Sequence, residues 1–172
     1  IEKECGDTEF LGYDTLNADA KVSAVIKDNK VVEEAGADDK VEIILDRSPF
    51  YGESGGQVGD SGTIKAEGLS FEIGNTKKIR DILVHSGTVI RGRIKQGMTV
   101  QAAVDEQKRR AVMRNHTATH LLHAALKAVL GDHNKQAGSL VADDRLRFDF
   151  NHFFAMDRKE IGEVEEIVNK RI

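Results

Sequence analysis

Short segments in which apolar and polar residues alternate follow one another over the first hundred positions, separated by turns that contain Gly, Asn or Asp. Strands are predicted at residues 21–26, 30–32, 41–45, 63–65, 69–73, 82–84, 88–94 and 98–104. Asp28-Asn29 and Ala66-Glu67-Gly68 each lie between two of these strands and predict hairpin turns. Many short strands at this spacing are typical of a small barrel or sandwich, so we expect a β-barrel-like domain over residues 1–104.

The pattern changes at Asp105. From there to Leu130 the chain contains no Gly or Pro and is rich in Ala, Leu, Lys and Arg, which predicts one long helix. Asp105 is a suitable N-cap, and Gly131 is a suitable residue just beyond the C-terminal end. Residues 121–130 are apolar on nearly every side, so this half of the helix is predicted to be buried against a sheet.

Two further strands and a final helix are predicted after the long helix. The strands cover residues 139–141 and 146–150, and Asp157 with Glu160 resembles the capping box of a helix. The predicted fold class is therefore α+β. A small β-barrel-like domain precedes a second domain, residues 105–172, which is the first part of an α+β core with a long histidine-bearing helix.

Composition narrows the functional classes. No run of about 18 apolar residues occurs in the 172-residue chain, so no membrane span is expected. Cys5 is the sole cysteine, which excludes an internal disulfide and is consistent with a cytoplasmic protein. The net charge of −4 argues against a dedicated nucleic-acid-binding module. Two basic stretches, residues 77–95 and 108–114, could still hold one phosphate backbone if they meet in space.

The most distinctive feature is a pair of histidines four residues apart on the predicted helix. His116 and His120 share one face, one turn apart, and two imidazoles so placed can bind one zinc ion. His123 could be a third ligand or a residue that orients one. Thr117 occupies the place of the glutamate of zinc proteases, which disfavours a metalloprotease. A hydrogen-bonded histidine pair without metal is the alternative. Further ligands could come from Cys5, His85, His133, Asp149 and His152.

A glycine-rich loop is the second unusual stretch. Five glycines between Gly52 and Gly62 allow the backbone to turn sharply and to approach a ligand closely, although such a loop could simply connect two strands. Residues 52–56 fit the Gly-x-Ser-x-Gly pattern of α/β-hydrolases. A turn and a strand follow instead of the helix that this motif requires, so a serine hydrolase is disfavoured. Neither a phosphate loop nor a dinucleotide fingerprint occurs.

Four blocks of sequence together resemble alanyl-tRNA synthetases. They are residues 10–14, 46–60, 116–123 and 138–150, in this order. The resemblance implies the editing domain, which hydrolyses mischarged Ser-tRNA(Ala) and Gly-tRNA(Ala). It implies a zinc ion held by His116, His120 and a Cys-x-x-x-His pair expected beyond Ile172, so that this chain alone is expected to be inactive. ATP and Mg²⁺ would belong to an aminoacylation domain elsewhere in the parent ligase.

The resemblance also implies residue roles. Gln136 and Thr117 are expected near the aminoacyl group, where a neutral amide or hydroxyl cannot serve as general base. The loop of Gly55, Gly56 and Gln57 is expected to line the same pocket, and Arg114 to contact the substrate. The expected partners are the 3′ end of tRNA(Ala) and other domains of the same synthetase. A non-catalytic tRNA-contacting module and a free-standing trans-editing deacylase remain alternatives.

Overall fold

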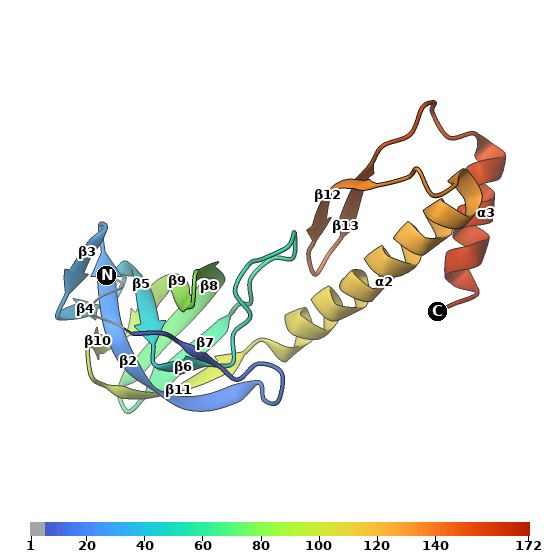
Figure 1. Ribbon diagram of the computed structural model, residues 1–172. Coiled ribbons are helices and arrows are strands. Elements are labelled where there is room, and N and C mark those ends of the chain that lie inside the picture. Colours follow the sequence, from blue (N-terminus) through green and yellow to red (C-terminus); the bar gives the residue numbers. More distant parts are fainter. Residues whose placement is uncertain (1–5) are drawn as a thin grey trace. The chain divides into compact units, whose positions relative to one another are not determined.

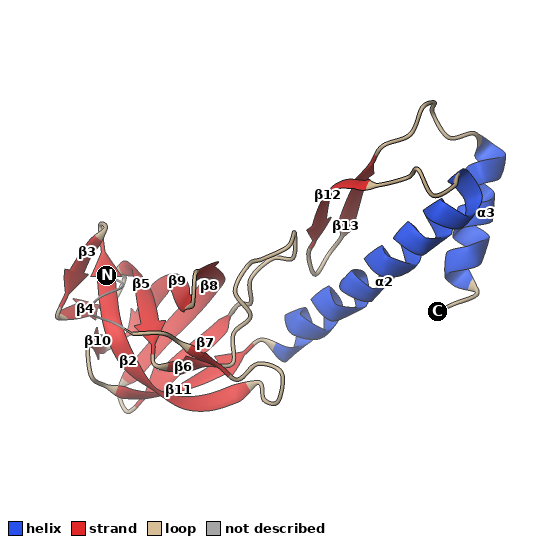
Figure 2. Cartoon of the chain, in the orientation of Figure 1, coloured by secondary structure: helices blue, strands red, loops and turns tan. Residues whose placement is uncertain are grey.

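The structure is a computed structural model that describes residues 6–172, which form two compact units. The barrel unit contains residues 6–54 and 58–109, and the helical unit contains residues 55–57 and 110–172. The candidate ligand Cys5 lies outside the described residues. Figure 1 shows the strands of the barrel unit, and Figure 2 separates helices from strands by colour.

The barrel unit is a closed antiparallel ring of six strands. Their order is β11-β7-β8-β9-β5-β2, and β11 also pairs with β2, which closes the ring. These strands are β2 (Asn17–Lys27), β5 (Lys40–Leu45), β7 (Gly62–Ala66), β8 (Leu69–Ile79), β9 (Ile82–Arg91) and β11 (Thr99–Val104). Short strands accompany the ring: β1 (Glu9–Phe10), β3 (Lys30–Val32), β4 (Glu34–Gly36), β6 (Arg47–Ser48) and β10 (Arg93–Lys95). Closure removes the exposed sheet edges that an open sheet of this size would leave.

Alternating side chains fill the barrel. Ile43, Phe71 and Ile73 are almost completely buried and belong to one large apolar cluster. Ile44, which points to the other face of β5, is buried in a second cluster with residues of β2 and β9. The period of two along each strand therefore places apolar residues inside the ring, and parts of its outer face are covered as well.

The hairpins predicted from the sequence are confirmed. Asp28 and Asn29 have φ angles of 51° and 61° between β2 and β3, as the preferred two-residue hairpin turn requires. The predicted break between residues 84 and 88 is wrong, because β9 runs through it. His85 is a buried polar residue there, and Gly87 lies so close to β8 that a Cβ would be 2.0 Å from the Glu72 carbonyl oxygen. Both residues resembled a turn in the sequence.

The helical unit contains most of α2 (Glu106–Leu130) with β12 (Gln136–Val141), β13 (Leu146–Phe150) and α3 (Arg158–Asn169). The predicted helix ends are confirmed: the Asp105 carboxylate accepts from the Lys108 amide at 3.0 Å, and Gly131 has φ of 100°. The capping box of Asp157 and Glu160 is also present. The α+β class is confirmed. Residue 104 ends β11, and the division of the chain into domains there stays a prediction.

One side of α2 packs on the rest of its unit. Ala125 and Leu126 are buried against Val164 of α3, and Phe148 and Phe150 of β13 pack on the same cluster. The predicted burial against a sheet is observed on one side of this half only, since Ala124, Lys127 and Ala128 are exposed. The small side chains of Ala124 and Ala128 and the flexible side chain of Lys127 made this exposed side look like a buried one in the sequence. No helix among residues 6–172 combines the length with the hydropathy that a membrane crossing needs.

Candidate active site

His116 and His120 bring two imidazole nitrogens together on α2. Their Nε2 atoms are 3.1 Å apart, and their ring centroids are 5.0 Å apart. His116 is half-buried and His120 is exposed, so the two nitrogens converge at the surface of the helical unit. The predicted convergence of this pair on one helix face is therefore observed.

Gln57 fixes the orientation of the first histidine. Its side chain is buried, and Oε1 lies 2.6 Å from Nδ1 of His116. With the amide oxygen as acceptor, Nδ1 carries the proton, and the neutral ring presents a lone pair at Nε2. Metal-binding histidines are commonly held in this way by a hydrogen bond to the other ring nitrogen.

The glycine loop reaches this position by pairing with β12. The carbonyl of Gly56 accepts from the amide of Val141 at 2.8 Å, and Gln57 forms an isolated parallel bridge with the same strand residue. Gly56 has φ of 85°, and a Cβ there would lie 2.5 Å from Oγ of Ser139. Only glycine allows the loop to lie this close to the strand.

Gln136 joins the same group through Ser139. Its Nε2 donates to Oγ of Ser139 at 3.0 Å, and Ser139 is the residue against which Gly56 packs. The structure thus brings together Gly56, Gln57, Gln136, His116 and His120 within the helical unit. Gly55, the remaining loop residue, has open space around it. Ser139 was not singled out as a site residue, because a lone serine on a strand gives no signal of such a link.

The histidine pair fits half of a tetrahedral zinc site. Two nitrogen ligands about 2.0–2.1 Å from a tetrahedral zinc ion lie about 3.3 Å apart, close to the observed 3.1 Å. Among residues 6–172, no cluster of three or more His, Cys, Asp or Glu side chains is arranged to hold a metal ion. His116 and His120 would hold the ion, and Gln57 would orient the first of them.

The other histidines and Asp149 are engaged elsewhere. His133 and His152 pair with each other at 3.3 Å, and Asp149 accepts from Arg147. His123, considered as a third ligand, packs against Phe148 with ring centroids 5.0 Å apart and ring planes tilted by 40°. Its Nε2 is buried without a hydrogen-bond partner among the described residues. These residues therefore do not complete the site.

His85 is a structural residue of the barrel. Its Nδ1 donates to the carbonyl of Ile43 at 2.9 Å, and its Nε2 accepts from the hydroxyl of Ser48 at 2.8 Å. Burial lowers the pKa of His85 to about 4, although the bond to the Ile43 carbonyl opposes this shift. Both ring nitrogens are occupied, so the candidate role of His85 as a metal ligand is wrong.

Thr117 and Arg114 lie in a different hollow of the helical unit. It has a volume of about 730 Å³, and its lining also includes Arg110, Met113 and Arg171. The hydroxyl of Thr117 donates to the carbonyl of Met113 at 3.1 Å. Neither histidine of the pair, nor Gln57 or Gln136, lines this hollow. The two residues are therefore not gathered with the rest of the predicted site.

The predicted phosphate-binding role fails for one basic residue. Arg109 is buried in the barrel unit, where it forms an ion pair with Asp60. It also donates to the carbonyls of Gly12 at 3.0 Å and Pro49 at 2.9 Å. In the second basic stretch, Arg93 and Lys95 pair with Glu34 and lower the pKa of its carboxyl. The sequence gives no sign that Arg109 is buried and its basic neighbours are not, because its partner Asp60 lies 49 positions away along the chain.

The chain is similar to known proteins over nearly all of its own 172 residues. The family described as tRNA synthetases class II (A) matches residues 1–108. The alanine–tRNA ligase of Thermoanaerobacter sp. (strain X514) is 53% identical over 165 residues, or 96% of this chain and 19% of that protein. The ligase of Acetivibrio thermocellus is 54% identical over 166 residues, with the same shares. That of Pelotomaculum thermopropionicum is 49% identical over 173 residues, covering 100% of this chain and 20% of the relative.

The chain spans about a fifth of the length of these curated relatives. The matched region includes the glycine loop, and the longer alignments include the histidine pair of α2 as well. The resemblance predicted from four sequence blocks is confirmed. The chain belongs to the class II (A) tRNA synthetase family, and it is similar to alanine–tRNA ligases over nearly all of its residues.

Proposed function

We propose that this chain is part of an alanine–tRNA ligase and that its helical unit carries a site that hydrolyses mischarged tRNA. The substrates would be Ser-tRNA(Ala) and Gly-tRNA(Ala). The single observation that carries this proposal is the arrangement of Gln57, His116 and His120, in which a buried amide sets the tautomer of one of two converging imidazoles. A histidine pair with only a packing role would not need this orienting contact.

Hydrolysis of such an ester requires an oriented water and stabilisation of the oxyanion that forms at the carbonyl. A zinc ion, when bound, would supply polarisation of the carbonyl oxygen or of the water. Gln57 holds the proton of His116 at Nδ1 and so would leave the lone pair of Nε2 available to the ion. The backbone amides of Gly55 and Gly56 would donate to the substrate.

Gln136 would recognise the aminoacyl group. Its Nε2 already donates a hydrogen bond to Oγ of Ser139, so its amide oxygen is oriented and can accept a hydrogen bond from the α-ammonium group of the substrate. Serine and glycine differ too little from alanine for one binding pocket to exclude both, and a second hydrolytic site solves that problem. No protein general base is assigned, because Gln and Thr side chains do not titrate near neutral pH.

Two more zinc ligands are needed for a tetrahedral site. The resemblance implies a Cys-x-x-x-His pair, and the 172 residues contain none, since Cys5 is the only cysteine. The test therefore uses the whole ligase that contains this segment, in which ATP and Mg²⁺ would serve aminoacylation. We expect His116→Ala to lower the rate of Ser-tRNA(Ala) deacylation at least 100-fold and to lower bound zinc, with aminoacylation unchanged.

His133→Ala is the matched control, because His133 is an exposed histidine that pairs only with His152 and Phe153. It should leave both deacylation and zinc content unchanged. If His116→Ala deacylates Ser-tRNA(Ala) as fast as the wild type, the hydrolytic proposal falls. The remaining function would then be a tRNA-contacting module without catalysis. Similarity to ligases of about five times this length favours the synthetase over a free-standing deacylase.

A further inference from the structure

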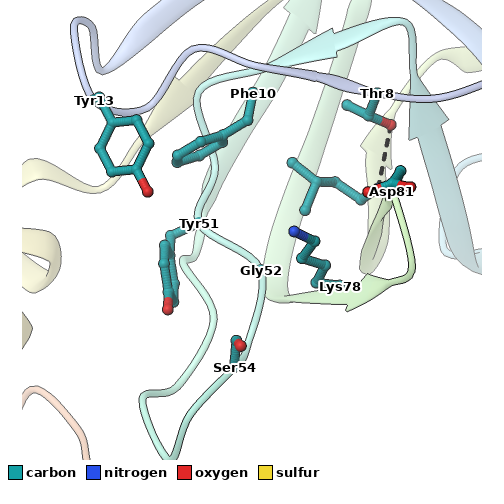
Figure 3. Close-up of a pocket in the computed structure, with 9 residues that line it drawn as sticks. Thr8, Phe10, Tyr13, Tyr51, Gly52, Ser54, Lys78 and Asp81 are labelled. Carbon is teal, nitrogen blue, oxygen red and sulfur yellow. Dashed lines mark hydrogen bonds between the residues drawn. The ribbon is translucent and has the colours of Figure 1, made fainter.

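A pocket of about 370 Å³ lies in the barrel unit. Figure 3 shows that its lining has two chemically different ends. Phe10, Tyr13 and Tyr51 form the aromatic end, whereas Lys78 and Asp81 lie at the polar end. This volume is at the small end of the range for ligand pockets, which suits one small planar group with a charged substituent.

Two tyrosine rings pack on Phe10 at the aromatic end. Phe10 packs edge-to-face against Tyr13 at 5.0 Å and against Tyr51 at 6.3 Å. Tyr13 is 88% exposed, so its ring contributes little to the core of the barrel unit. A tyrosine ring held at the rim of a pocket and left in water is a suitable stacking surface for another planar ring.

The polar end carries an uncompensated cation. Within the described part of the chain, no acidic side chain pairs with the ammonium group of Lys78, in contrast to Lys95 and Arg93. The hydroxyl of Thr8 is already used, since it donates to the carbonyl of Leu45 and accepts from the amide of Leu83. The exposed side chain of Asp81 adds a hydrogen-bond acceptor to the pocket lining.

The loops that form the pocket are held rigidly. Arg109 binds the carbonyls of Gly12 and Pro49, which adjoin Tyr13 and the segment that leads to Tyr51. Its partner Asp60 accepts from the amide of Tyr51 at 2.7 Å. One buried ion pair therefore fixes the backbone beside both tyrosines. A preorganised pocket loses less conformational entropy when a ligand binds.

We infer that this pocket binds one unpaired nucleotide of an RNA strand. The base stacks on Tyr13 and Tyr51, the phosphate lies at Lys78, and Asp81 accepts from a ribose hydroxyl or a base amino group. Aromatic faces beside a cationic side chain are the combination by which proteins recognise single-stranded nucleic acid. One lysine gives too little charge for a duplex backbone, which favours a single nucleotide. The inference uses neither zinc nor the histidine pair, so it stands or falls independently of the proposed hydrolysis.

The composition of the chain provides a direct test. It contains two tyrosines and no tryptophan, and both tyrosines line this pocket. Tyrosine fluorescence of the chain therefore reports on the pocket alone. We expect a single-stranded RNA trinucleotide that carries no amino acid to quench this emission with a saturable binding curve, after correction for absorbance by the bases. Lys78→Ala should reduce the slope of log affinity against log salt by about 0.7.

Tyr13→Ala should weaken the same binding about 5- to 150-fold, as expected for loss of one base-stacking surface. Tyr13→Phe keeps the ring and should bind within about threefold of the wild type. Lys77→Ala, the adjacent exposed lysine outside the pocket, should change the salt slope less than Lys78→Ala. Circular dichroism checks the fold of each variant.

Three results would overturn the inference. Binding by Tyr13→Ala within twofold of the wild type would show that the pocket is not the site. Equal binding of inorganic polyphosphate would show that bases are not recognised. Equal affinity for an RNA duplex and for the trinucleotide would show that an unpaired base is not what the pocket recognises. None of these results bears on deacylation, so the two proposals are tested separately.

Discussion

The two units differ in how completely their buried polar groups are hydrogen-bonded. In the barrel unit, the buried side chains of His85, Thr76 and Arg109 all have hydrogen-bond partners within the unit. In the helical unit, Nε2 of His123 and both amide atoms of Asn134 are buried without a partner in the described structure. Unpaired polar atoms cost about 1–3 kcal/mol each, and water or another group usually satisfies them.

The difference indicates that buried polar side chains have different roles in the two units. The barrel uses polar side chains to fix loops around a large apolar core, so removing one of them should weaken folding. The helical unit has a small core of Ala125, Leu126 and Val164 and holds its candidate site by hydrogen bonds to one loop. Removing a polar side chain there should change ligand binding more than folding.

The largest expected effect is on the ion pair of Arg109 and Asp60. Arg109→Met leaves the Asp60 carboxylate buried without its cation and should lower the free energy of unfolding by about 3–5 kcal/mol. Denaturant unfolding of the chain measures this loss. Arg93→Met is the control, because the exposed pair with Glu34 should be worth less than about 1 kcal/mol. Equal losses in the two variants would contradict the structural role of the buried pair.

The second prediction concerns pH and the buried His85. Its pKa is about 4 in the folded chain and about 6.5 when unfolded, so between these values the unfolded chain binds more protons. Stability should be fully present above pH 6.5 and should fall by about 3 kcal/mol as the pH drops towards 4. Denaturant unfolding across this range measures the fall. His85→Gln cannot titrate, and it should reduce the pH dependence by that amount. An unchanged pH profile in this variant would assign the dependence to other groups.

The sequence predicted elements where local signals suffice and missed contacts between distant residues. The hairpin at Asp28 and Asn29 and the capping box at Asp157 follow from backbone preferences of a few neighbouring residues, and both are present. The spacing of His116 and His120 likewise fixes their convergence on one helix. In contrast, the pairing of Arg109 with Asp60 spans 49 positions and depends on closure of the barrel.

The candidate site likewise depends on contacts between distant residues that local sequence signals do not predict. Gln57 and His116 are 59 residues apart, and no periodicity links them, so family resemblance placed them at one site but their direct contact was not predicted. Thr117 was expected in the same pocket by that resemblance. A helix turns successive residues to different faces, and Thr117 lines another hollow.

The smallest predicted effect tests whether Gln57 belongs to the site or to the fold. Gln57→Ala removes the acceptor that holds the proton of His116 at Nδ1, so the ring can rotate or present the wrong tautomer. We expect zinc affinity of the whole ligase to fall about 10- to 100-fold, the usual cost of losing such an orienting contact. Denaturant unfolding should change far less than for Arg109→Met. Gln136→Ala is the matched control, because that amide bonds Ser139 and touches neither histidine, and it should retain the zinc affinity of the wild type. Unchanged zinc affinity in Gln57→Ala together with a large loss of stability would place Gln57 among the fold-supporting residues and remove the contrast between the two units.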